Sequence, residues 1–381
     1  MAGHPTRTLL LAQAHQELTA LRQLAATLAE VVPDGEAGQA VVDRFGLLTD
    51  RVARELKAVL RDPDPGTGWP SLNAARASAL ELTREVLAYC HGELLRRAEL
   101  DHGIGDVAER LLDHLTRGAG IDRRVLLSVA ESAFLTHTVS MIRNRFPDVS
   151  VWSLPVLAHE FGHHVASTMA HGDPRFRDEW RPVRQYLSEE ADSGEGSREV
   201  ELAHLNELFA DVYATYVLGA AYPLHLLMLA AQPGPGTDTH PAWSRRVRTV
   251  LSTVDALGED EHPTAAGFRG LSRKLASLTR ANFPDAVGTA AEQALAGLQA
   301  RAMIELLREH AYARARYPMP DRVQSLVIDP REPEREPVAG TTVADVLNAA
   351  WLWRLDRGDG PNWLLDEASR RAISLSQQVK E

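Results

Sequence analysis

Near the middle of the chain, residues Ser153 to Ala170 read SLPVLAHEFGHHVASTMA. A serine that can cap a helix precedes a proline suited to the first helical turn, and an apolar run then continues to the end of the stretch. His159 and His163 are four residues apart, so both lie on one face of the predicted helix. Burying histidines and a glutamate in an apolar helix is unfavourable unless another group pairs with them. The stretch therefore predicts a metal-binding helix.

The HExxH motif, His159-Glu160-Phe161-Gly162-His163, indicates hydrolytic chemistry as well as metal binding. Two imidazole rings at this spacing can both reach one zinc ion, at about 2.0–2.1 Å per nitrogen. Zinc lowers the pKa of a bound water to about 7, which provides a nucleophile at neutral pH. We expect Glu160 to act as the general base on that water and then to pass the proton to the leaving amine.

A catalytic zinc needs a third protein ligand and an open fourth position. The longer HExxHxxGxxH motif is not present, because Ala166 and Met169 stand at its glycine and third-histidine positions. We expect Glu207 to be the third ligand. Glu207 and Asp211 share a helical face, and Asp211 is expected to accept the other ring N–H of a ligand histidine. His204, three residues before Glu207, is an alternative ligand.

The HEFGH and ELFAD segments resemble those of the gluzincin metallopeptidases. Thr239-His240-Pro241, with Arg246 six residues after the histidine, resembles the H-P-x-x-x-x-R segment of the CAAX-prenyl-protease and heat-shock membrane-protease group. The resemblance implies that His240 binds the substrate or stabilises the developing oxyanion, and that Arg246 is a cation that organises the site. It spans residues 142–257. That group usually carries membrane spans, and this chain does not, so the resemblance implies a soluble relative.

The remaining patterns predict a mainly α protein (α+β), with a zincin-like metallopeptidase core and a small β-sheet flanked by helical regions. Apolar stripes in the first hundred residues, the first beginning at Leu11, predict helices that pack on themselves or, alternatively, a coiled-coil arm for dimerisation. Runs at 125–129 and 138–142 are compatible with strands, and the second run offers an edge for an extended substrate. The expected regions are a helical region at 1–119, the metallopeptidase core at 120–260, and a mostly helical region at 261–381 with a Pro-rich linker at 329–337.

Composition excludes several other classes of protein. The chain has 381 residues, and its formal net charge of -11 argues against nucleic-acid binding and against attraction to anionic lipid. Its single cysteine, Cys90, excludes an internal disulfide and cysteine-rich zinc sites. The uncharged segment from Val212 to Ala231 is long enough to span a bilayer, but Gly219 and Pro223 within it favour two buried helices broken near Pro223. We therefore expect a cytoplasmic protein, with a membrane-embedded protease as the alternative.

The leading functional hypothesis is a zinc-dependent metallopeptidase, a hydrolase that acts on a peptide or protein. It would hold one Zn²⁺ per chain through His159, His163 and Glu207. The alternative is a regulatory or interaction protein with a latent or degenerate zinc site. In both cases the N-terminal helices are candidates for binding a helical protein partner or a second copy of the chain. Both hypotheses include zinc binding, so peptidase activity that is lost in Glu160→Gln would distinguish them.

Overall fold

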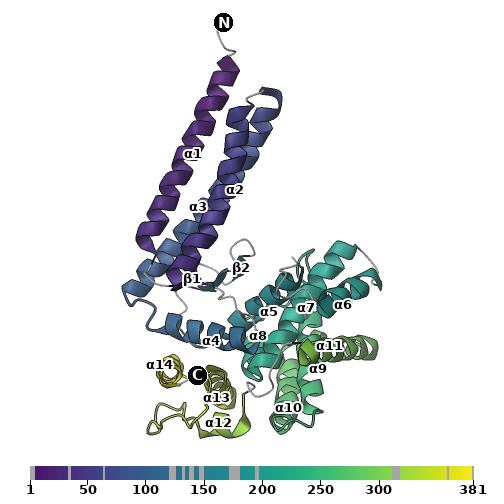
Figure 1. The fold of residues 1–381 in the computed structure, drawn as a ribbon. Coiled ribbons are helices and arrows are strands. Elements are labelled where there is room, and N and C mark those ends of the chain that lie inside the picture. The colour runs from purple at the N-terminus through teal and green to yellow at the C-terminus, as the bar shows by residue number, and fades with distance from the viewer. Residues whose placement is uncertain are drawn as a thin grey trace. The chain divides into compact units, whose positions relative to one another are not determined.

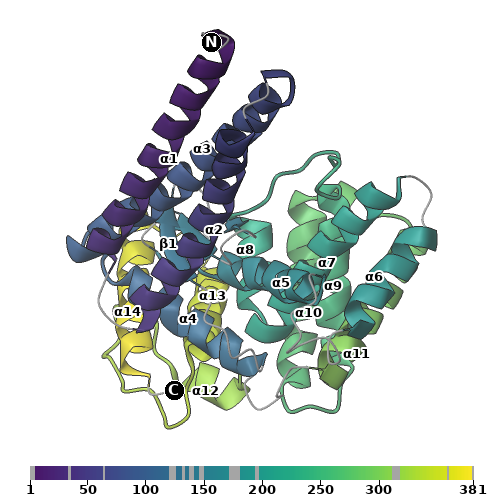
Figure 2. The ribbon, with the colours of Figure 1, turned by 45° about the horizontal axis from the view of Figure 1, so that its top comes forward.

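The computed structural model describes residues 5–32, 36–62, 65–119, 126–130, 134–136, 141–145, 150–170, 181–193, 197–310, 318–357 and 360–379. These residues are mostly helical (Figures 1 and 2). The chain forms two compact units, Met1–Leu100 with Ser128–Glu131, and Asp101–Leu127 with Ser132–Glu381. Residues 101–119, expected with the N-terminal helices, therefore belong to the second unit. The expected core and C-terminal regions share that unit.

The first unit is built from three long helices that pack against one another: α1 (Pro5–Val31), α2 (Glu36–Arg61) and α3 (Pro65–Arg97). Their buried residues recur at steps of three and four, so each helix turns one apolar face toward the other two. The stripe of α1 begins at Leu10, which is fully buried, rather than at the partly buried Leu11. The unit thus has an apolar core of its own.

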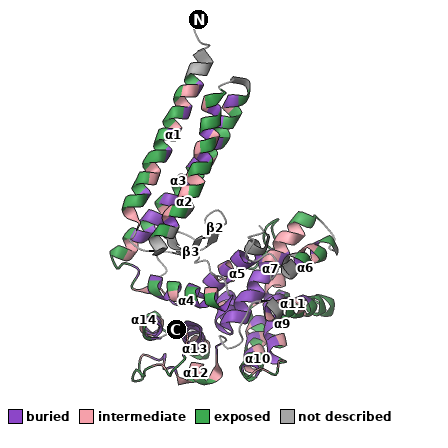
Figure 3. Cartoon of the chain, in the orientation of Figure 1, coloured by how far each residue is buried: buried purple, intermediate pink, exposed green. Residues whose placement is uncertain are grey.

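The second unit contains the remaining helices, and Figure 3 shows that buried residues are concentrated on α5, α7 and α8. Their bounds are α4 (Ile104–Gly118), α5 (Pro155–Ala170), α6 (Arg181–Ser193), α7 (Arg198–Leu218), α8 (Ala221–Met228), α9 (Trp243–Gly258), α10 (Ala265–Asn282), the 3₁₀ turn η1 (Pro284–Ala286), α11 (Ala290–His310), α12 (Pro320–Ser325), α13 (Val343–Arg357) and α14 (Asn362–Gln378). In this unit α7 packs against α5, α6, α8, α9, α11 and α13. Helix α7 is therefore central to the unit.

Three short strands lie before α5: β1 (Leu126–Ala130), β2 (Phe134–Thr136) and β3 (Met141–Arg145). Strands β2 and β3 are antiparallel, with Leu135 opposite Ile142. Residues 138–140, part of the strand expected to receive a substrate, lie outside the described residues, and substrate addition here stays a prediction. A zincin-like core likewise stays a prediction.

Helices α5 and α7 approach each other closely at one point, where Gly162 faces Ala210. A Cβ atom added at Gly162 would lie 2.9 Å from Ala210 Cα and 3.2 Å from Ala210 Cβ, closer than side chains normally pack. Glycine and alanine are the small residues that allow two helix backbones to come this near. Phe161 and Tyr213 are fully buried, with their rings 5.9 Å apart. The close contact sets the distance between the residues that the two helices carry.

The uncharged segment forms the end of α7 and all of α8, and almost all of it is buried. The helices are broken at Gly219, whose φ is +59°, and not near Pro223 as the sequence predicts. Pro223 lies in the first turn of α8, where its missing N–H is not needed. Asn348 of α13 stabilises this break. Its side-chain oxygen accepts a hydrogen bond from the Ala220 N–H, and its side-chain nitrogen donates one to the Leu218 carbonyl oxygen. No helix among the described residues is long and apolar enough to cross a membrane.

The Pro-rich segment at 329–337 is exposed over most of its length but anchored at its start. Asp329 is buried, and its carboxylate accepts from Arg331 and from Arg357 of α13. Arg371 of α14 donates to the backbone carbonyl of Glu332 at 2.9 Å. The segment is therefore attached to the last two helices.

The close contact of α5 and α7 can be tested with Gly162→Ala. The added methyl group must push the two backbones apart, which we expect to cost about 1–3 kcal/mol of unfolding free energy and to weaken metal binding. The control is Gly270→Ala in α10, where an added Cβ meets no atom within 4 Å. This control should match or exceed the wild-type stability. Urea denaturation measures both effects, and equal stabilities for the two variants would show that the contact at Ala210 is not tight.

Candidate metal centre

Two helices of the second unit bring three metal-ligating side chains together. His159 and His163 lie one turn apart on α5, and Glu207 lies on α7. One ligand atom from each side chain lies within 4.8 Å of the other two, and all three side chains are buried. The Nε2 atoms of the two histidines are 3.1 Å apart, and Glu207 carboxylate oxygens lie 3.5 Å from His159 Nε2 and 3.2 Å from His163 Nε2. This group can hold a metal ion.

The polar atoms of these three side chains favour the binding of a cation. Glu207 Oε2 is buried and accepts no hydrogen bond from the described residues. Buried carboxylate oxygens normally have such a partner. The two imidazole nitrogens and the carboxylate oxygen are also the kind of donor set that binds zinc in catalytic sites. The residues that are present therefore fit a metal ion.

A second set of side chains contacts the other nitrogen of the His159 ring, Nδ1. Asp211, one turn after Glu207, is fully buried, and its Oδ1 lies 3.0 Å from His159 Nδ1. Tyr222 of α8 donates its hydroxyl to the same Asp211 oxygen, and Arg246 of α9 donates to both Asp211 oxygens at 2.9 and 2.6 Å. An ionised aspartate can only accept hydrogen bonds. The network therefore assigns the ring proton of His159 to Nδ1 and leaves Nε2 free to bind a metal.

Electrostatic interactions keep both carboxylates of the centre ionised. Burial raises the pKa of Glu207, but the close polar contacts and charges of His159 and His163 hold it well below its ordinary range. Burial also opposes ionisation of Asp211, and the Arg246 guanidinium outweighs it and lowers the pKa of Asp211. Burial disfavours the charged form of His159, yet Asp211 and Glu207 raise the pKa of His159 to about 9. The centre thus attracts positive charge, which a proton or a metal cation can supply.

The metal-ligating group opens into a cleft of about 750 Å³. Glu160 lines this cleft beside the three ligands, and the sequence places it on the helical turn that joins the two histidines. Apolar side chains form another part of the wall: Val156, Leu226, Pro235, Pro241 and Trp243. A carboxylate, a group of metal ligands and an apolar surface therefore line the same open space.

His240 lies at the edge of this cleft, on the loop that joins α8 to α9. Its side chain is 59% exposed, and its Nε2 lies 3.6 Å from Glu207 Oε1. Thr239 Oγ1 lies 2.8 Å from His240 Nδ1, and the backbone N–H of Thr237 donates to the His240 carbonyl at 2.8 Å. The ring is therefore held from its Nδ1 side, with Nε2 directed toward the carboxylate of a ligand.

His204, the alternative third ligand, lies apart from the metal-ligating group. Its Nε2 is 2.7 Å from the carbonyl oxygen of Thr237, so it contacts the loop that carries His240. Among the residues considered for the centre, the structure brings together His159, Glu160, His163, Glu207, Asp211, His240 and Arg246 in and behind one cleft.

Sequence reasoning missed two residues that shape the centre. Tyr222 contacts both Asp211 and His159, and Gly162 allows α5 and α7 to meet. Tyr222 and His225 are the two polar side chains of the otherwise apolar α8, which is a signal of buried hydrogen bonds. The partner of Tyr222 could not be identified from sequence, because α8 reaches the centre only through the turn at Gly219.

Comparisons with protein-family models, with curated proteins and with solved structures found no match. The candidate centre is therefore characterised by its own residues. These residues are a buried group that can hold a metal ion, a carboxylate beside it, and a histidine at the mouth of the cleft.

Removal of one ligand should remove the metal. We expect His163→Ala to lose most of its bound metal, because only two ligands remain. His204→Ala is the matched control, since that imidazole contacts Thr237 outside the metal-ligating group. The metal content per chain, measured by mass spectrometry after dialysis, distinguishes the variants. One tightly bound metal ion in His163→Ala would place the site elsewhere.

The hydrogen-bonded partner of His159 should also affect metal affinity. Asp211→Asn should weaken metal binding by about 10–100-fold, because the ring loses the carboxylate that fixes its proton and orientation. Tyr222→Phe removes one hydrogen bond and keeps the Asp211–Arg246 ion pair, so its effect should be smaller. Competition with a chromophoric chelator measures both affinities. An unchanged affinity in Asp211→Asn would exclude this role.

Proposed function

We propose that the chain is a zinc-dependent metallopeptidase of the gluzincin type, which hydrolyses peptide bonds in a peptide or protein substrate. The observation that carries the proposal is the grouping of His159, His163 and Glu207 within 4.8 Å of one another. The position of Glu160 in the same open cleft supports it. One Zn²⁺ per chain is the expected cofactor.

The donor set supports zinc over other common ions. Two imidazole nitrogens and one carboxylate oxygen form the His₂Glu set of catalytic zinc sites, whereas Mg²⁺ and Ca²⁺ prefer oxygen ligands alone. Three protein ligands leave one coordination position open, which a catalytic site requires and a structural site does not. The ligands line an open cleft, so a substrate can reach that position.

In this mechanism the ion, when bound, supplies a water nucleophile near neutral pH and polarises the substrate carbonyl. Glu160 would act as the general base, accepting a proton from the attacking water and passing it to the leaving amine. Glu160 is partly exposed and lines the cleft, so its carboxylate is accessible to water and to substrate. Glu207 and Asp211, in contrast, are buried, and each contacts a histidine of the HExxH motif. This suits Glu207 as a metal ligand and Asp211 as a residue that positions His159.

His240 and Arg246 have different roles in the proposal. His240 is exposed at the mouth of the cleft, where it can donate a hydrogen bond to the oxyanion that develops on the substrate. Arg246 donates to both oxygens of Asp211 and lies 3.9 Å from Glu207 Oε2, so it positions these two carboxylates. This geometry supports the roles that the resemblance implies for both residues.

The experiment that tests the proposal compares the wild type with Glu160→Gln. Removal of the general base should lower peptide cleavage by about 10²–10⁴-fold while the zinc content stays the same. Cleavage is measured on a peptide library and on casein, with the zinc content of each sample determined in parallel. Wild-type cleavage rates in Glu160→Gln would exclude the mechanism. A fully zinc-loaded wild type that cleaves neither substrate would favour the regulatory hypothesis.

A separate variant tests the role of His240. If this side chain stabilises the transition state, His240→Ala should lower kcat by about 10²–10³-fold. KM, zinc content and Tm should change little, because His240 is exposed and lies outside the metal-ligating group. Steady-state kinetics and thermal unfolding provide these quantities. Loss of zinc would make His240 a ligand, and full activity would remove it from the mechanism.

A further inference from the structure

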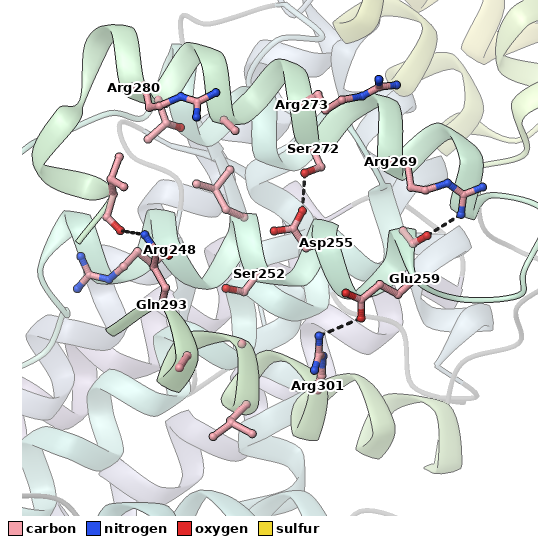
Figure 4. A pocket seen from close by; sticks show the side chains of 18 of the residues that line it. Arg248, Ser252, Asp255, Glu259, Arg269, Ser272, Arg273, Arg280, Gln293 and Arg301 are labelled. Atoms are coloured by element: carbon pink, nitrogen blue, oxygen red, sulfur yellow. Dashed lines mark hydrogen bonds and ion pairs between the residues drawn. The ribbon is translucent and has the colours of Figure 1, made fainter. Parts of the chain in front are cut away.

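A groove of about 1160 Å³ runs between α10 and α11 in the second unit. Helices α10 and α11 both pack against α9, and Figure 4 shows α9 between them as the floor of the groove. On α9 and the residue that follows it, the lining residues run from Arg248 to Glu259, a length of about 17 Å at the helical rise per residue. The groove therefore extends along about three helical turns.

The charge of the groove is opposite to that of the chain as a whole. Five arginines and two carboxylates line it, a local net charge of +3 (5 − 2) in a chain whose formal net charge is -11. The arginines are spread along the groove (Figure 4) and are Arg248, Arg269, Arg273, Arg280 and Arg301. A positive groove in an acidic protein favours an acidic occupant.

Not all of these arginines are neutralised within the protein. Arg301 pairs with Glu259 at 2.9 Å, Arg248 pairs with Glu292 at 3.0 Å, and Arg269 donates to the carbonyl oxygen of Gly258. Arg273 and Arg280 are exposed on α10 and form no ion pair within the described part of the chain. Two cations on one wall are thus available to a partner.

Small and apolar residues line the groove between these charges. Ala276 lies on α10, and Ala294, Gly297 and Leu298 lie on α11. Leu298 is 68% exposed, and a Cβ atom added at Gly297 would meet no atom within 4 Å. The absence of a side chain at Gly297 leaves room for another chain to approach the helix. An apolar lining of this kind favours a polypeptide over a simple polyanion.

We propose that this groove binds an acidic amphipathic helix of a partner protein. The helix would place its apolar face against Leu298 and the small residues, and its carboxylates beside Arg273 and Arg280. This is the mode in which a helix enters a groove through apolar residues at i, i+3, i+4 and i+7. A groove of about three turns accommodates such a set of anchors. The proposal is independent of peptidase activity, because none of its residues lines the metal cleft.

The binding experiment uses a fluorescent 16-residue peptide with leucines at helical spacing and glutamates on the opposite face. Fluorescence anisotropy with the full chain should show saturable binding that weakens with salt. Two further peptides serve as controls: one has the same composition in scrambled order, and the other has lysine in place of glutamate. Neither should bind. Equal binding of the scrambled peptide would identify a non-specific polyanion site, and no binding of the acidic helix would overturn the proposal.

Variants with matched controls test whether the peptide binds in the groove. Joint Arg273→Glu and Arg280→Glu substitution should weaken binding about tenfold by charge reversal, whereas Arg335→Glu, an exposed arginine outside the groove, should not. Gly297→Tyr should block the groove and weaken binding to a similar degree. Gly267→Tyr is the control, because a side chain there also meets no atom within 4 Å but lies outside the groove. Equal affinities for each variant and its control would place the peptide elsewhere.

Discussion

The candidate metal centre exists because α5 and α7 approach each other closely. Gly162 faces Ala210 at a distance that no larger pair of side chains would allow, and the ligands lie immediately on either side of this contact. His159 and His163 flank Gly162 on α5, and Glu207 precedes Ala210 by one helical turn. A displacement of one helix by the width of a methyl group would separate the carboxylate from the imidazoles. The glycine of the motif therefore has a structural role of its own, because it sets how closely α5 and α7 approach.

The second constraint is electrostatic. A fully buried aspartate is unfavourable unless its charge is compensated. Arg246 provides that compensation to Asp211, and Tyr222 donates a hydrogen bond to the same carboxylate. These partners come from α9 and α8, which follow α7 in sequence and pack against it. The candidate centre is thus stabilised by four helices of the second unit, α5, α7, α8 and α9, and cannot form from the HExxH helix alone.

Sequence periodicity accounts for the part of the centre that depends on local geometry. Residues four apart share a helical face, so the pairing of His159 with His163, and of Glu207 with Asp211, could be predicted without knowledge of the fold. The partnership of Tyr222 with Asp211 could not be predicted, because it depends on the direction that α8 takes after Gly219. The break was predicted near Pro223, since proline usually ends a helix. Proline is tolerated in a first turn, and the positive φ of Gly219 determines where α7 ends.

The proposed function requires that His159, His163 and Glu207 jointly bind one zinc ion. The most direct test is a crystal structure of the zinc-loaded protein, with anomalous diffraction data collected on both sides of the zinc absorption edge. We expect one anomalous peak, with the two Nε2 atoms at about 2.0–2.1 Å from it and a Glu207 oxygen at about 2.0–2.2 Å. A zinc peak at another site, or a zinc ion at this site that Glu207 does not ligate, would contradict it.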